Sequence, residues 1–139
     1  MVIHTATLRA PAGAVLAALV LVFPAQGAQC DALAEAAAVV CEINSVRADR
    51  GYGELAVDRR LRESGYITGR VAWRVGETLA WGRARLATAA ATVTEWMRSA
   101  SHRRILLGPY REIGVGVSAG DPLGGTGTTY TADFGLLGG

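Results

Sequence analysis

Residues 113–134, IGVGVSAGDPLGGTGTTYTADF, decide the fold class of this chain. Apolar residues alternate with glycine over residues 113–117, and residues 128–134 are rich in strand-forming types, so the pattern predicts two β-strands. Between them, Asp121-Pro122 and Gly124-Gly125 are typical of a turn and predict a hairpin loop. These residues are therefore expected to form an antiparallel strand pair.

Helical patterns precede these strands. Apolar residues recur at three-to-five spacing over residues 32–50, which predicts a helix. Thr88 is a suitable N-cap for a second helix over residues 89–100. Residues 55–62 fit either a turn or a short helix. Helices followed by antiparallel strands predict an α+β fold rather than a doubly wound sheet.

The first residues resemble a secretory signal. Residues 12–23 form an unbroken apolar run of twelve behind a polar start that contains Arg9, and small residues follow Pro24. A membrane-spanning helix needs about 20 apolar residues, so this run is too short to span a bilayer. We therefore predict a signal peptide over residues 1–27, a single domain over residues 28–139, and a secreted, extracellular protein with no transmembrane anchor after cleavage.

Two cysteines, Cys30 and Cys41, begin the predicted mature chain. In an exported protein an even number of cysteines favours a disulfide, although two separate thiols are the alternative. Eleven residues of continuous helix would separate the Cα atoms by about 16 Å, whereas a disulfide tolerates at most about 7 Å. If the bridge forms, the helix that carries Cys41 must therefore begin after Cys30, within residues 31–38.

The charge of the chain does not favour a nucleic-acid partner. There is no lysine, and of the 14 basic residues Arg9 lies in the predicted leader, which leaves 13 arginines against 12 acids. These charges are interspersed along the sequence, which is typical of an ordinary solvated surface. No basic stripe indicates nucleic-acid binding.

Few residues of the chain could carry out acid–base, metal-binding or nucleophilic chemistry. His4 lies in the predicted leader, so His102 is the only histidine expected in the mature chain, and Glu77 is a carboxylate in an apolar segment flanked by glycines. A zinc site needs three or four protein ligands, so Glu77 and His102 are an incomplete set that would support only a weakly bound divalent cation such as Zn or Mg. Ser99, three residues before His102, lacks the context of an activated nucleophile.

Structural interpretations of the same residues stand beside the chemical ones. Glu77 would then accept hydrogen bonds from backbone amides in a glycine-bounded turn. His102 would lie at a helix C-terminus, where the helix dipole favours its charged form. The three tryptophans would be core residues, since large aromatic side chains dominate small cores; they are Trp73, Trp81 and Trp96.

Six segments follow one another in the order of a known set of motifs. They are CEINSVR (41–47) for N-x-x-R, LAVDRRL (55–61) for L-x-x-D-x-x-L, GETLAWG (76–82) for G-E-N-[IL]-A-x-G, WMRSASHR (96–103) for W-x-x-S-x-x-H-R, and REIGVGV (111–117) and YTADFG (130–135) for two terminal strands. Over residues 41–135 the chain thus resembles the CAP superfamily of SCP-like extracellular domains. The family is named for cysteine-rich secretory proteins, antigen 5 and pathogenesis-related proteins of type 1.

The resemblance is to bacterial members, with an internal deletion. It implies a CAP-type α-β-α sandwich around an antiparallel central sheet, and a cavity that holds Glu77 and His102 with Ser99 nearby. Bacterial members usually place a long helix and an F-S-H segment in an interval that is filled here only by residues 62–75. The resemblance therefore implies one shortened helical layer and the loss of the first cavity histidine, and Thr78 replaces the motif asparagine.

These observations favour binding over catalysis. Because CAP members bind sterols and other lipids or associate with cell walls, the resemblance implies a non-catalytic extracellular binding module with such a partner. One alternative is a divalent-metal-dependent extracellular hydrolase. The other is a degenerate family member without a ligand, whose shortened domain folds weakly because an apolar face has lost its cover.

Overall fold

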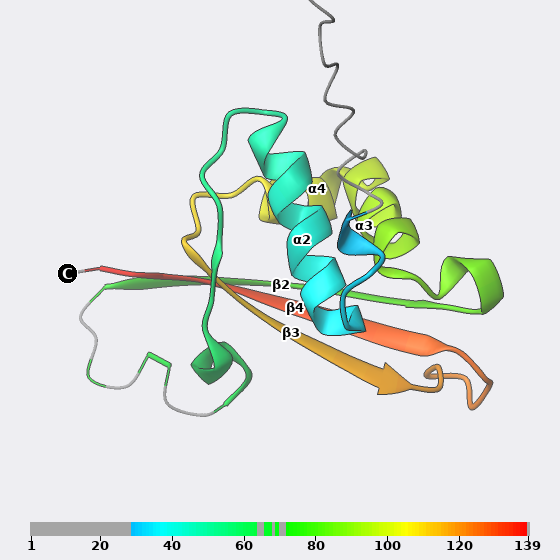
Figure 1. Ribbon diagram of the computed structural model, residues 1–139. Coiled ribbons are helices and arrows are strands. Elements are labelled where there is room, and N and C mark those ends of the chain that lie inside the picture. Colours follow the sequence, from blue (N-terminus) through cyan, green and yellow to red (C-terminus); the bar gives the residue numbers. More distant parts are fainter. Residues whose placement is uncertain (1–28, 64–65, 68, 70–71, 139) are drawn as a thin grey trace, which may run out of the picture.

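The computed structural model describes residues 29–63, 66–67, 69 and 72–138, so the predicted leader lies outside the described residues. The elements, in chain order, are α2 (Glu35–Ala48), β1 (Ala56–Val57), the 3-10 helix η1 (Arg59–Arg62), β2 (Trp73–Gly82), the 3-10 helix η2 (Ala84–Leu86), α3 (Ala89–Arg98), α4 (Ala100–Leu106), β3 (Glu112–Ala119) and β4 (Thr128–Leu137). Helices α2, α3 and α4 lie on one side of the sheet, and the segment that contains η1 lies on the other (Figure 1).

The α+β prediction is confirmed, with one correction to the sheet. The strand order is β1-β3-β4-β2, and β4 pairs antiparallel with both β2 and β3. The predicted antiparallel sheet is nevertheless mixed, because β1 pairs parallel with β3. Arg47 of α2 binds the carbonyls of Gly53 and Tyr110, which shortly precede β1 and β3, so the two strands begin at the same end of the sheet and run in the same direction.

The segment expected as a glycine-bounded turn is instead part of a long strand. All ten residues of β2, Trp73–Gly82, pair with β4 in one continuous register. Trp73, Val75, Leu79 and Trp81 alternate along it, which is the period-two pattern of a strand with one distinct face. The glycines at positions 76 and 82 suggested a turn, but Gly76 lies directly beneath Tyr110 and Ile105, where a side chain would not fit.

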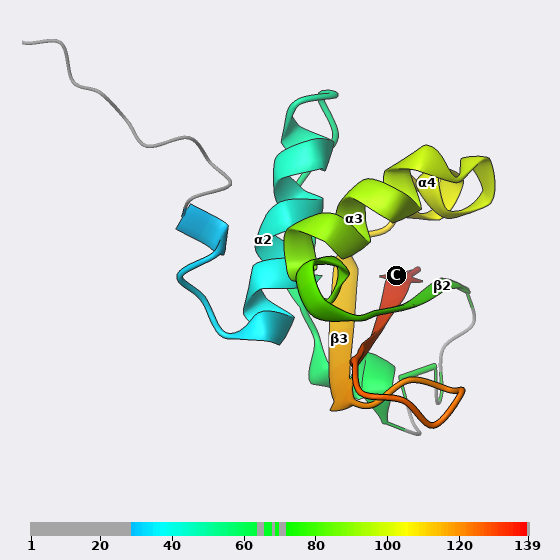
Figure 2. The same cartoon turned by 90° about the vertical axis from the view of Figure 1, so that its right-hand side faces the viewer.

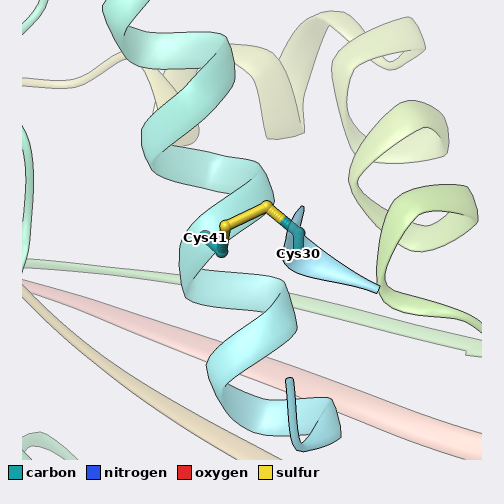
Figure 3. Close-up of a disulfide and its surroundings, with 2 residues drawn as sticks. All are labelled: Cys30 and Cys41. Atoms are coloured by element: carbon teal, nitrogen blue, oxygen red, sulfur yellow. A yellow bond between two sulfur atoms is a disulfide. The ribbon is translucent and has the colours of Figure 1, made fainter. Parts of the chain in front are cut away.

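The disulfide between Cys30 and Cys41 is present, with the Cα atoms 5.6 Å apart. Figure 3 shows the bridge joining the short segment before α2 to the side of α2 itself. Helix α2 begins at Glu35, within the predicted window of residues 31–38. The chain turns back between the two cysteines, as the distance limit required.

The predicted helix over residues 89–100 is two helices. Thr88 caps α3 as expected, because its Oγ1 accepts a hydrogen bond from the Ala91 amide at 3.2 Å. Ser99 then adopts an extended backbone (φ −79°, ψ 123°), and α4 begins at the next residue. His102 consequently lies within α4, so its expected position at the C-terminus of the preceding helix was wrong.

The core lies between the helices and the sheet. Its largest fully buried side chains include Trp96 of α3, Ile43 of α2, Leu106 of α4, and Tyr130 and Phe134 of β4. The tryptophan prediction is therefore correct for Trp96, which is 1% exposed, and wrong for the two tryptophans of β2. Trp73 and Trp81 are 51% and 50% exposed because their strand face points away from the helices.

The opposite face of the sheet has a much smaller cover among the described residues. Side chains of Leu61, Arg62 and Tyr66 pack against glycines of β3 and β4. Arg62 also forms an ion pair with Asp133 of β4 at 2.9 Å. This cover reaches β3 and β4 but leaves the outward side chains of β2 half-exposed.

Candidate functional site

The structure places Glu77 on the face of the sheet that points away from the helices. Its neighbour Thr78 is 1% exposed and faces the helix layer, and Gly76 lies beneath Ile105 of α4. Successive side chains of a strand point to opposite faces. Glu77 is accordingly exposed, with Asp133 as its cross-strand neighbour.

His102 and Ser99 belong to the helix layer on the other face. His102 is half-buried in α4, and Ser99 lies at the junction with α3. The Ser99 hydroxyl lies 3.0 Å from that of Ser101, so its hydrogen-bonding partner is not the imidazole. The structure thus does not bring Glu77 together with His102 or Ser99, because the sheet separates the carboxylate from α4.

The described residues also do not gather a metal-ligand set. No three histidine, cysteine, aspartate or glutamate side chains of the described part of the chain lie close enough to hold one ion. Both cysteines are consumed by their disulfide. The metal-dependent hydrolase therefore has no ligand set in this part of the molecule.

Arg47 is the polar side chain that the sequence interpretation overlooked. The residue is buried, at 3% exposure, and its guanidinium donates hydrogen bonds to four backbone carbonyls. They are Leu106 O at 2.7 Å, Gly53 O at 2.8 Å, Gly108 O at 3.0 Å and Tyr110 O at 3.4 Å. Burial lowers the pKa of Arg47, which nevertheless remains charged as arginines do in proteins. The residue therefore fastens α2 to the segment between α4 and β3.

Asn44 performs a similar task one helical turn earlier. Its side-chain amide exchanges two hydrogen bonds with the backbone of Leu55, at 2.9 and 3.1 Å. Residues three apart on a helix share a face, so the N-x-x-R spacing was the signal that both side chains point to one place. Their role is to position the loops that flank β1 and β3, not to carry out chemistry.

A hollow between α2 and η1 is a candidate binding site, and we call it the α2–η1 groove. Its volume is about 510 Å³, and it crosses the edge of β3 beyond the two residues that pair with β1. Its lining comprises Ala36, Ala37, Val40, Val57, Arg59, Arg62, Glu63, Gly114 and Val115. Because α2 contributes alanines here, the groove has an apolar wall with room beside the helix.

The charged residues of the groove lie on the η1 side. Arg62 is engaged with Asp133 across the sheet. Arg59 and Glu63 are exposed, and neither forms an ion pair with any other described residue. Within the described part of the chain, the α2–η1 groove therefore combines an apolar wall with one free cation and one free anion.

Comparison with known proteins shows the fold but no family. No protein-family profile and no curated protein matches the sequence. Among solved structures, the chain is similar to an outer surface protein from Borrelia burgdorferi, with a TM-score of 0.52 and 18% identity. The match covers 72% of this chain and 90% of that one. At this identity the similarity concerns the arrangement of helices and strands alone.

One further observation bears on the compartment. The disulfide is typical of proteins outside the reducing cytosol. Within the residues that the structure describes, none of the helices has the length and hydropathy needed to cross a bilayer.

Proposed function

We propose that this protein is an exported, non-catalytic binding domain of CAP type, and that its ligand is a single-chain amphipathic lipid held in the α2–η1 groove. The observation that carries the proposal is the groove itself, with apolar side chains on one wall and, on the other, Arg59 and Glu63 without ion pairs to described residues. The ligand's hydrocarbon chain would lie against α2 and β3. Its head group would meet η1.

The dimensions and lining of the groove support a small apolar ligand. Ligand sites in proteins typically enclose about 300–1,000 Å³ and have mostly apolar walls with a few polar groups. The groove, at about 510 Å³, falls within this range. One cation and one anion at its rim are complementary to a zwitterionic head group such as phosphocholine, in which a phosphate and a quaternary ammonium are linked.

The roles of the motif residues support the assignment to the CAP type. Asn44 and Arg47 of N-x-x-R secure two loops. Asp58 of L-x-x-D-x-x-L caps η1 by accepting a hydrogen bond from the Arg60 amide at 2.9 Å, and Trp96 is the largest of the fully buried side chains. The motif residues therefore hold the fold together. This is what we expect if the chain has the CAP fold but no catalytic site.

Filling the groove is expected to abolish lipid binding. Ala36→Phe places an aromatic ring against the apolar wall while the buried face of α2 is left unchanged. Titration with lysophosphatidylcholine below its critical micelle concentration, followed by calorimetry, should show saturable binding to the wild type and none to the variant. The matched control is Ala90→Phe on α3, which does not line the groove and should bind normally if its circular dichroism is native. Absence of saturable binding to the wild type would favour the ligand-less alternative.

Charge substitutions at the rim are expected to identify the head group. Arg59→Gln and Glu63→Gln should each weaken lysophosphatidylcholine binding about two- to fivefold, because exposed charge pairs contribute at most about 1 kcal/mol. Arg85→Gln in η2, away from the groove, is the matched control. Oleate and cholesterol, titrated in parallel, should bind more weakly. If oleate bound more tightly than lysophosphatidylcholine, and Glu63→Gln increased the affinity for oleate, the preferred head group would be a carboxylate rather than a zwitterion.

A further inference from the structure

Strand β2 forms an edge of the sheet. It pairs with β4 over its whole length, and no other described strand pairs with it. Figure 2 shows β2 at the rim of the fold, with the helices above and no described strand beyond it. One long hydrogen bond reaches its backbone from a described side chain, from the Tyr110 hydroxyl to the Val75 carbonyl at 3.4 Å. A free strand edge of this length is a template for pairing with another strand.

The side chains on the outward face of β2 are symmetric about Glu77. Reading outward from Glu77, the residues two positions away are Val75 and Leu79, and those four positions away are Trp73 and Trp81. The four apolar side chains are between 41% and 51% exposed. A strand whose apolar pattern reads the same in both directions is complementary to a second copy of itself running antiparallel.

We propose that two copies of this protein associate through their β2 edges, antiparallel, about a two-fold axis at Glu77. In this register Trp73 lies beside Trp81 of the second copy, and Val75 lies beside Leu79 of the second copy. Both contacts occur twice, as a two-fold interface requires. Registers shifted by two residues pair Glu77 with Val75 or Leu79 instead and leave a tryptophan without a partner inside β2.

The area available makes this dimer a weak one. Two half-exposed tryptophans leave about 250 Å² of surface to cover in each copy, and Val75 and Leu79, 48% and 41% exposed, bring this to about 400 Å². Stable interfaces bury about 800 Å² per partner. Even with backbone hydrogen bonds along the strand edge, we expect a dissociation constant on the order of tens of micromolar.

Glu77 limits the association. Like charges directly opposite one another on neighbouring strands are unfavourable, and the proposed axis places the two Glu77 carboxylates in that position. Removing the charge should therefore strengthen the dimer without adding a contact. This expectation separates strand pairing at this register from general adhesion between apolar surfaces.

Sedimentation velocity of the purified, disulfide-bonded protein over a concentration series tests the association. The wild type should show a concentration-dependent monomer–dimer equilibrium, which Glu77→Gln tightens about fivefold and Leu79→Lys weakens at least tenfold. The matched control is Leu123→Lys, which replaces an 80% exposed leucine in the β3–β4 loop and should not change the equilibrium. A wild type that stays monomeric to millimolar concentration would overturn the proposal, as would equal effects of Leu79→Lys and Leu123→Lys. A monomer whose tryptophan emission shifts only with lipid vesicles would overturn it too, and would assign this face to a lipid surface.

Cysteine cross-linking tests the register. Directly opposite residues of an antiparallel pair have Cα atoms about 4.5–5.5 Å apart, within the range for a disulfide. Glu77→Cys should therefore form an intermolecular disulfide on mild oxidation, with the Cys30–Cys41 bridge intact by mass mapping. The matched control is Leu79→Cys, whose copies would lie about 14 Å apart and should not cross-link. Equal cross-linking of both variants would contradict the register.

Because β2 and the α2–η1 groove lie at opposite edges of the sheet, failure of either proposal leaves the other intact.

Discussion

Arg47→Met is expected to lower the free energy of unfolding by about 4 kcal/mol, the largest effect of any substitution considered for this chain. Methionine retains most of the apolar stem but donates no hydrogen bond. Four carbonyl groups then lose a charged donor in a region where water has little access. Each buried acceptor left unpaired costs about 1–3 kcal/mol, less where it retains another partner.

Urea denaturation with the disulfide intact measures this effect. The matched control is Arg50→Met, two residues beyond the end of α2, where the exposed guanidinium donates a hydrogen bond to the Val46 carbonyl of α2 at 2.9 Å. That variant should lie within about 0.5 kcal/mol of the wild type. If Arg47→Met also lost less than about 1 kcal/mol, the carbonyl contacts would not be what fastens α2 to the segment after α4.

Removing the disulfide is expected to cost about 3 kcal/mol. The bridge closes a short loop, since the two cysteines are 11 positions apart, and the entropy of such a loop in the unfolded chain gives this magnitude. Cys30 is itself 1% exposed, so the segment before α2 would lose a packed anchor as well. For a domain of this size the loss corresponds to a fall in Tm of about 10–20 °C.

The contribution of the disulfide to stability is best measured by reducing the bridge, in addition to substituting the two cysteines. Adding a reductant to the wild type should lower its Tm to about that of the Cys30→Ser/Cys41→Ser double variant, and should leave the Tm of that variant unchanged. A wild-type Tm that does not respond to complete reduction would show that the bridge is peripheral to the fold.

The sequence predicted those helices and strands whose indicators lie within the element itself or in the residues beside it. The cysteine spacing placed the start of α2, Thr88 marked the start of α3, and the alternation with glycine predicted β3. Strand β2 was missed although Trp73 to Trp81 alternate as a strand should. Glycine at both ends of the motif resembles a turn, and only the contact of Tyr110 and Ile105 with Gly76 explains why a strand needs glycine there.

The site was less predictable because it depends on long-range geometry. Once residues 76–82 are a strand, the orientation of Glu77 follows from the buried position of Thr78, and the carboxylate faces away from His102. Arg47 could be assigned to a helix face from its spacing to Asn44. Three of its partner carbonyls, however, lie 59 to 63 residues away along the chain, so no local pattern reveals them.

The most direct test of the proposed function is the location of the lipid on the protein. In a titration of the ¹⁵N-labelled protein with lysophosphatidylcholine, followed by amide chemical shifts, we expect saturable changes at residues 36–40, 57–63 and 114–115. These segments line the α2–η1 groove. The amides of Glu77 and His102 should remain unchanged. Saturable shifts concentrated at Glu77 and His102, with none in the groove, would contradict lipid binding in the α2–η1 groove and point instead to the cavity implied by the family resemblance.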